Sequence, residues 1–124
     1  MTFERLPYLA AFLLLVVGLY AIVAKRNLIK VIVGLLVIDY ATNLFLILVG
    51  YRSNSGGAPM APILTRDLAP AQLAAHAVDP LPQALILTSI VIGLSVTALV
   101  VAMAIRLYDR YGTFDTGRMR NLRG

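Results

Sequence analysis

Residues 28–50 read LIKVIVGLLVIDYATNLFLILVG, and this apolar segment is the strongest evidence for the fold. It reaches the roughly 20 apolar residues that a helix needs to cross a lipid bilayer. A helix is expected because an isolated strand would leave its backbone polar groups unpaired in lipid. Lys30 lies near the beginning of the stretch, where its long side chain reaches the membrane interface. Asp39 lies near the middle and is the only acid within the long apolar runs of the chain.

Two further apolar runs flank this stretch, over residues 7–24 and 81–107. Of the 124 residues, 60% are hydrophobic and 14% are charged, whereas soluble proteins average about 25% charged residues. Residues 9–24 also resemble the core of a signal peptide, but Glu4 before them and a basic pair after them favour a retained span. The sequence therefore predicts an all-α membrane protein with three transmembrane helices, in a single domain over residues 1–124.

Two links of unequal length join the predicted spans. The link over residues 25–27 is short, so the first two spans are expected to form an antiparallel hairpin. The loop over residues 51–80 is longer and contains irregular chain rich in glycine and proline. Within it, residues 70–78 are expected to form a short surface helix that begins at a proline. Asp79 then suits the N-cap position of the third span, with two prolines in its first turn.

The basic residues predict the orientation of the chain in the membrane. With three spans, the first link and the tail over residues 108–124 lie on the same side. That side holds eight of the eleven basic residues, namely Lys25, Arg26, Lys30, Arg106, Arg110, Arg118, Arg120 and Arg123. The other side holds Arg5, Arg52 and Arg66. Because basic residues are enriched on the cytoplasmic side, we expect a multi-pass protein of the cell membrane with its N-terminus outside and a basic cytoplasmic tail.

Asp39 is the leading candidate for a functional residue. A carboxyl group in the middle of a bilayer costs about 2.5–3.5 kcal/mol on insertion scales, so such residues usually face a bundle interior or a watery path. Asn43 lies four residues later on the same helix face, and Thr42 lies beside it. Two interpretations remain open: these residues form part of an ion pathway, or Asp39 pairs with a basic residue of a partner helix and only fixes assembly.

Small residues predict where helices pack closely. Ser89, Gly93 and Thr97 recur every four residues on the third span, which is a spacing typical of helix-packing surfaces in membranes. Gly34 on the second span is expected to allow the close approach of another helix.

Other kinds of chemistry find little support in the sequence. The chain has no cysteine, which excludes disulfides and thiolate metal sites, and its one histidine, His76, has no second histidine to share a metal ion with. No phosphate-binding loop, nucleophilic triad or dinucleotide fingerprint is present. No basic stretch interleaves with aromatic residues as in a nucleic-acid surface. We therefore expect no catalytic residue, metal or cofactor in this chain, and no nucleic acid among its partners.

Two segments resemble known membrane proteins. Asn27-Leu28-Ile29-Lys30, Gly34-Leu35 and Asn43-Leu44 resemble the second span of the K subunit family of bacterial complex I. A second segment closely resembles the third-span entrance of the C subunit of Mrp-type cation/proton antiporters, and of the equivalent small subunit of membrane-bound hydrogenases. It reads Asp79-Pro80-Leu81-Pro82-Gln83-Ala84.

The resemblance implies a small membrane subunit without a redox cofactor of its own, embedded in the lipid bilayer. It would pack against larger antiporter-like subunits and against a subunit resembling the J subunit of complex I. Its role would lie in Na⁺/H⁺ antiport or proton translocation. In complex I, the K subunit has a glutamate that would fall at Leu36, and Asp39 lies about one turn later. We hypothesise that Asp39 takes over part of that role.

Three versions of this function differ in what surrounds the subunit. One is a stand-alone Mrp antiporter. Another is the membrane arm of a redox-driven complex such as a membrane-bound hydrogenase, with a cytoplasmic redox arm as a further partner; the chain would then be a subunit of an oxidoreductase. The alternative is a purely structural scaffold with no part in ion conduction. A small multidrug exporter is disfavoured, because those proteins have four spans and an acid in the first.

Overall fold

The computed structural model describes residues 2–51 and 59–120, and these residues are helical for most of their length. The elements in chain order are α1 (Thr2–Ala24), α2 (Leu28–Gly50), α3 (Pro70–His76), α4 (Pro80–Tyr111) and a 3₁₀ turn, η1 (Thr116–Arg118). The three long helices are sufficiently long and apolar to cross a membrane. The all-helical architecture and the three-span membrane class that the sequence predicts are therefore confirmed at this level.

Two helices are longer than the predicted spans. α1 begins at Thr2 and runs through Pro7, which the sequence placed at its beginning. α4 continues past residue 107 to Tyr111, because no helix-breaking residue intervenes before Gly112. Gly112 ends the helix with a left-handed backbone (φ 66°), and its N–H donates to the Tyr108 carbonyl oxygen at 2.7 Å.

The beginnings of α2 and α4 are capped by side chains. Asn27 Oδ1 accepts hydrogen bonds from the backbone N–H groups of Ile29 (2.9 Å) and Lys30 (3.4 Å). Asp79 Oδ1 accepts from the Leu81 N–H at 3.0 Å, and Pro80 occupies the first helical position, as the sequence predicts. These caps satisfy backbone donors that the first turn of a helix otherwise leaves unpaired.

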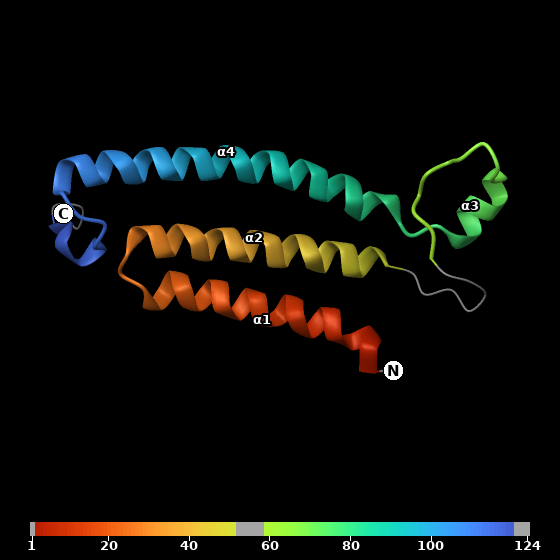
Figure 1. Cartoon of the computed structure of the whole chain (residues 1–124), viewed down its shortest axis with the longest axis horizontal. Helices are drawn as coiled ribbons and strands as arrows, with labels where there is room; N and C mark the ends of the chain where they lie inside the picture. The colour runs from red at the N-terminus through yellow and green to blue at the C-terminus, as the bar shows by residue number, and fades with distance from the viewer. Residues whose placement is uncertain (1, 52–58, 121–124) are drawn as a thin grey trace.

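The described part of the loop before α4 is held by backbone hydrogen bonds. The Met60 N–H donates to the His76 carbonyl oxygen, and the Val78 N–H donates to the Met60 carbonyl oxygen, both at 3.0 Å. The short helix α3 lies between these contacts and begins at Pro70, where the sequence predicts a surface helix. The loop therefore folds as a small unit beyond the ends of the long helices (Figure 1).

Helix α2 lies between α1 and α4 and packs against both (Figure 1). Its contact with α1 centres on two glycines. A Cβ atom at Gly34 would lie 2.9 Å from the Gly18 carbonyl oxygen and 2.8 Å from the Ala21 Cβ. A Cβ atom at Gly18 would lie 2.9 Å from the Gly34 carbonyl oxygen. Since real Cβ atoms do not approach backbone this closely, both positions must stay glycine for the helices to touch here.

Helix α4 packs against α2 along one narrow stripe. Its buried and half-buried residues recur every three or four positions: Pro82, Ile86, Ser89, Gly93, Thr97, Val100, Ala104, Leu107 and Tyr111. Every other residue of α4 is exposed, and most of those in its middle are large and apolar. Apolar surface of this extent belongs against lipid or against other membrane subunits.

The chain after α4 turns back toward the link between α1 and α2 (Figure 1). The Leu28 N–H donates to the Phe114 carbonyl oxygen at 2.8 Å, and the Thr116 N–H donates to the Arg26 carbonyl oxygen at 2.8 Å. The sequence does not predict this contact, because hydrogen bonds between backbone groups this far apart leave no residue pattern. We call residues 113–120 the return segment.

Candidate functional site

Asp39 lies in the middle of α2 on the side that faces α4. Directly opposite is Gly93, where a Cβ atom would lie only 2.9 Å from Asp39 Oδ2. The carboxylate therefore rests against α4 at a position where any larger residue would push on it. The one ion pair within the described residues lies elsewhere, between Arg118 and Asp115, so Asp39 has no basic partner in that part of the chain.

A groove of about 410 Å³ opens beside this contact, between α2 and α4. Its lining is mostly aliphatic and includes one carboxylate, Asp39, and three hydroxyl-bearing side chains. The lining residues are Leu35, Leu36, Asp39, Leu85, Thr88, Ser89, Ile92, Gly93, Val96 and Thr97. An acid in a groove of this composition is the arrangement expected where a membrane protein handles an ion or a proton.

The structure brings several of the predicted residues together. Asp39 from α2 meets Ser89, Gly93 and Thr97 from α4, so the candidate acid and the candidate packing row share one groove. Leu36, the position where the resemblance implies a glutamate in complex I, lines the same groove. In the sequence, Asp39 and the small residues of α4 are far apart. The register between α2 and α4 brings them into one groove.

Thr42 lies apart from this group. Its side chain is exposed, and its Oγ1 donates to the Ile38 carbonyl oxygen of the same helix at 2.9 Å. This bond occupies the hydroxyl proton within α2. Thr42 does not line the groove beside Asp39.

Asn43 is buried, with 8% of its surface exposed, and its Oδ1 has no hydrogen-bond partner among the described residues. A buried acceptor without a partner costs about 1–3 kcal/mol. Gly50 lies against Pro82, and Asp39 lies against Gly93. Because α2 and α4 are antiparallel, the same register puts Asn43 at the level of Ser89. The seam between α2 and α4 therefore carries polar groups at two successive levels.

The remaining predicted residues lie elsewhere. Gly34 faces α1, where it meets Gly18 on the opposite side of α2 from the groove. The family motif (residues 79–84) lies at the end of the α2–α4 contact where α2 ends and α4 begins. Asp79 caps α4, Pro82 is buried against Gly50, and Gln83 is exposed beside a small cavity of about 50 Å³. These contacts give the motif a structural role at the beginning of α4.

Gly18 is the contact residue that sequence reasoning missed. A signal for it exists, because Ala11, Gly18 and Ala21 are spaced by seven and three residues and so share one face of α1. Ala11 and Ala41 are both fully buried, which extends the same close contact between α1 and α2.

Comparison with known proteins places the chain among membrane subunits. Residues 6–124 match the family described as NADH-ubiquinone/plastoquinone oxidoreductase chain 4L. The chain is 37% identical over 117 residues to the C subunit of the Na(+)/H(+) antiporter of Alkalihalophilus pseudofirmus, covering 94% of this chain and 95% of that protein. It is 34% identical over 117 residues to the C subunit of the Na(+)/H(+) antiporter of Bacillus subtilis, covering 94% of both.

Two solved structures contain similar chains. One is the membrane-bound sulfane sulfur reductase, an archaeal respiratory membrane complex. Its chain is 43% identical with a TM-score of 0.75, over 88% of this chain and 92% of that one. The other is the Mrp complex from Dietzia sp. DQ12-45-1b. Its chain is 28% identical with a TM-score of 0.64, over 85% of this chain and 70% of that one.

Proposed function

This chain belongs to the NADH-ubiquinone/plastoquinone oxidoreductase chain 4L family, and from that membership we propose that it is a small subunit of an ion-translocating membrane complex. Relatives named as the C subunit of Na(+)/H(+) antiporters match it over nearly its whole length. The two structural neighbours are multisubunit membrane complexes. The exposed apolar surface of α1 and α4 supports the same conclusion, since it leaves room for other membrane subunits.

The observation that carries a direct role in ion movement is the position of Asp39. Its carboxylate lies against Gly93 in a groove with the hydroxyl-bearing residues Ser89 and Thr97, and no basic side chain of the described residues neutralises it. We therefore assign Asp39 to the ion pathway, with Asn43 as a neighbouring polar group. Thr42 is left out of the pathway, because its hydroxyl bonds within α2 on the exposed side.

The surroundings of the subunit follow from the same membership. We propose that larger antiporter-like subunits and a subunit resembling the J subunit of complex I cover its apolar faces. The excess of basic residues at the α1–α2 link supports an N-terminus outside and a C-terminus in the cytoplasm. The complex would then lie in the cell membrane.

A second version couples the same membrane module to a cytoplasmic redox arm. The specific observation in its favour is the likeness to the membrane-bound sulfane sulfur reductase, with 43% identity against 28% for the Mrp complex. In this version the chain serves the same ion pathway, and the redox chemistry belongs to other subunits.

Purification from native membranes in mild detergent, followed by mass spectrometry of every co-purifying protein, tests the proposed function. We expect large antiporter-like subunits to accompany the chain. Their presence without metal-bearing cytoplasmic proteins identifies a stand-alone antiporter, and their presence with such proteins identifies the redox-coupled version. A chain that purifies alone as a small oligomer would contradict both versions.

Replacing Gly93 with alanine tests whether the position of the Asp39 carboxylate against α4 matters for ion movement. The added methyl group would lie 2.9 Å from Asp39 Oδ2, so the carboxylate must move, which its flexible end allows. We expect coupled ion movement by the intact complex to fall about three- to tenfold while assembly stays unchanged.

The matched control for Gly93→Ala is Ser95→Thr, which adds a methyl group to an exposed position of α4 and keeps the hydroxyl that donates to the Val91 carbonyl oxygen. Ser95→Thr should transport like the wild type. Equal activity of both variants would show that the position of the Asp39 carboxylate is unimportant.

A further inference from the structure

One end of the helix bundle carries a concentration of positive charge, which we call the basic end. Its described members come from three regions far apart in the sequence: the α1–α2 link with the first turn of α2, the last turns of α4, and the return segment. They are Lys25, Arg26, Lys30, Arg106, Arg110, Arg118 and Arg120, and every one of them is exposed. The antiparallel register of α2 and α4 and the return segment together put these residues at the same end (Figure 1).

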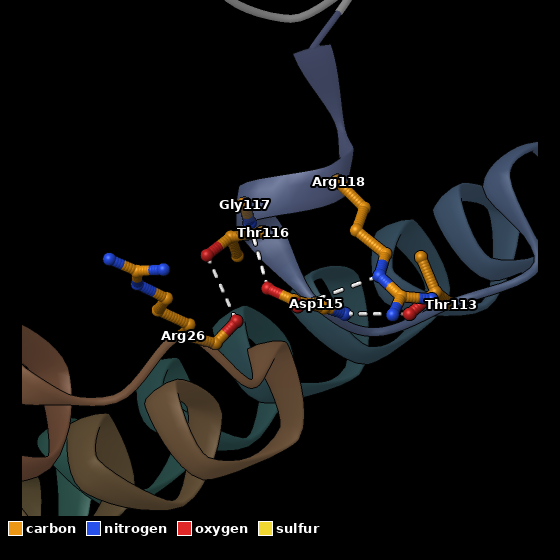
Figure 2. A network of polar contacts seen from close by, with 6 residues as sticks. All are labelled: Arg26, Thr113, Asp115, Thr116, Gly117 and Arg118. Atoms are coloured by element: carbon orange, nitrogen blue, oxygen red, sulfur yellow. Dashed lines mark hydrogen bonds and ion pairs between the residues drawn. The ribbon is translucent and has the colours of Figure 1, made fainter.

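The return segment is what adds Arg118 and Arg120 to this end. Thr116 donates twice to the Arg26 carbonyl oxygen, from its N–H at 2.8 Å and from its Oγ1 at 2.9 Å. Figure 2 shows Thr116 beside Arg26, with the Arg26 and Arg118 side chains extending to either side of the turn. Together with the hydrogen bond from the Leu28 N–H to the Phe114 carbonyl oxygen, these two bonds fix the chain after Gly112 relative to the α1–α2 link.

Apolar contacts reinforce this arrangement. The Phe114 ring stacks on the Tyr108 ring of α4 with centroids 4.5 Å apart, and Met119 is buried with 3% of its surface exposed. Arg118 and Arg120, which flank Met119, are consequently held at the surface; both are exposed, and Arg118 lies beside Asp115.

Few acidic groups oppose this charge. Among the described residues, Asp109 and Asp115 are the acids at this end, so the seven basic residues leave an excess of five positive charges. Asp115 is already engaged, because its Oδ1 accepts from the Gly117 N–H at 2.9 Å and its Oδ2 lies 3.9 Å from Arg118 Nε. The opposite end is different, since among the described residues there Arg5 and Arg66 are matched by Asp67 and Asp79.

The basic end lies where lipid headgroups are expected. It directly follows the apolar spans, and Lys25 and Arg110 lie over the rings of Tyr20 and Tyr111 at 5.2 Å and 6.0 Å from the ring centroids. Tyrosine rings gather at the boundary between hydrocarbon and headgroups. We propose that the basic end is a binding site for anionic phospholipids, whose headgroup phosphates are held by the basic residues that the return segment brings together.

Photo-crosslinking with the assembled complex tests this site. Wild-type complex is placed in vesicles that contain a trace of headgroup-photoreactive lipid, either phosphatidylglycerol or phosphatidylcholine with matched acyl chains. The readout is the labelling of peptides covering residues 25–30 and 106–120. Phosphatidylglycerol should label them at least fivefold more than phosphatidylcholine, and added salt should reduce this difference.

Two variants separate the charges from the fold that gathers them. The double variant R118Q/R120Q removes two charges from exposed positions and should lower phosphatidylglycerol labelling about fivefold, a change equivalent to roughly 1 kcal/mol. The variant T116P keeps every charge but removes both hydrogen bonds to the Arg26 carbonyl oxygen. It should lower labelling of residues 25–30 by a similar factor. The matched control R5Q/R66Q neutralises two arginines at the opposite end and should leave labelling unchanged.

Three results would overturn the proposal. Equal labelling by the two lipids is expected where another protein of the complex covers the basic end, and it would exclude lipid selectivity. Unchanged labelling in R118Q/R120Q would exclude the arginines as ligands. Unchanged labelling in T116P would exclude a role of the Thr116–Arg26 hydrogen bonds in holding the return segment at the site. None of these results depends on ion transport, so the test of the lipid-binding site is independent of the proposed function.

Discussion

Replacing Gly34 with leucine is expected to separate α1 from α2 and to destabilise the helix hairpin by about 2–3 kcal/mol. Any Cβ atom at this position would lie 2.9 Å from the Gly18 carbonyl oxygen and 2.8 Å from the Ala21 Cβ. Because backbone cannot yield as a flexible side chain does, the helices must move apart and lose their close contact. Overpacking of this kind costs about 1–3 kcal/mol and occasionally more. The loss should appear as a lower thermal transition of the purified complex in detergent and as a lower yield.

The control for this prediction is Ala24→Leu, which enlarges an exposed position at the end of α1. It should leave the thermal transition unchanged. Gly18→Leu should behave like Gly34→Leu, since a Cβ atom at Gly18 would lie 2.9 Å from the Gly34 carbonyl oxygen. Wild-type stability of both glycine variants would contradict the close helix contact.

The helices are predictable from the sequence because their signals are local. An apolar run of about 20 residues is sufficient to predict a span. The residues Asn27 and Asp79 directly precede the helices that they cap. Gly34 can likewise be recognised from its own segment as a position for close helix packing, but the residue that it contacts cannot. Gly18 shares one face of α1 with Ala11 and Ala21, but its contact with Gly34 follows only from the packing of the two helices.

The site depends on geometry that a single sequence does not contain. Asp39 and Gly93 are far apart along the chain, and their meeting follows from the register between α2 and α4. Thr42 is grouped with Asp39 and Asn43 in the sequence because the three residues lie close together there. With 3.6 residues per turn, Thr42 and Asn43 fall on opposite sides of Asp39 around the helix. Only Asn43 turns toward α4 and becomes buried, whereas Thr42 remains exposed.

The return segment was beyond prediction for a different reason. Its place depends on backbone hydrogen bonds from Leu28 and Thr116, which any residue type can make. Phe114 of this segment stacks on Tyr108. This contact can be recognised only once the chain is known to reverse at Gly112. The basic residues of this region indicate orientation in the sequence, and the fold gathers them into one surface.

Replacing Asp39 with asparagine is expected to lower coupled ion movement at least tenfold without disturbing assembly. Asparagine has nearly the same shape as aspartate, so the contact with Gly93 is kept. It has neither a negative charge nor a proton to exchange, so a pathway that depends on either is interrupted. Asp39→Glu should retain part of the activity, because it keeps the carboxylate but displaces it toward α4.

Two further variants at this place serve as controls for Asp39→Asn, which itself separates ion conduction from structural pairing. Thr42→Val removes a hydroxyl from the exposed side of α2, where it bonds only within its helix, and should transport normally. Asp39→Lys puts a positive charge against α4 and should prevent assembly under either interpretation. A purely structural role for Asp39 predicts that Asp39→Asn transports normally while Asp39→Lys fails to assemble.

The most direct test is the rate of coupled proton movement in vesicles that contain the purified complex, compared between the wild type and Asp39→Asn. Mass spectrometry first establishes that the Asp39→Asn complex contains every protein of the wild-type complex. A pH-sensitive dye inside the vesicles then reports proton movement driven by a sodium gradient or, in the redox-coupled version, by an electron donor. We predict a complete complex whose coupled proton movement falls to about one tenth of the wild-type rate or less. A complete Asp39→Asn complex that moves protons at the wild-type rate would contradict the assignment of Asp39 to the ion pathway.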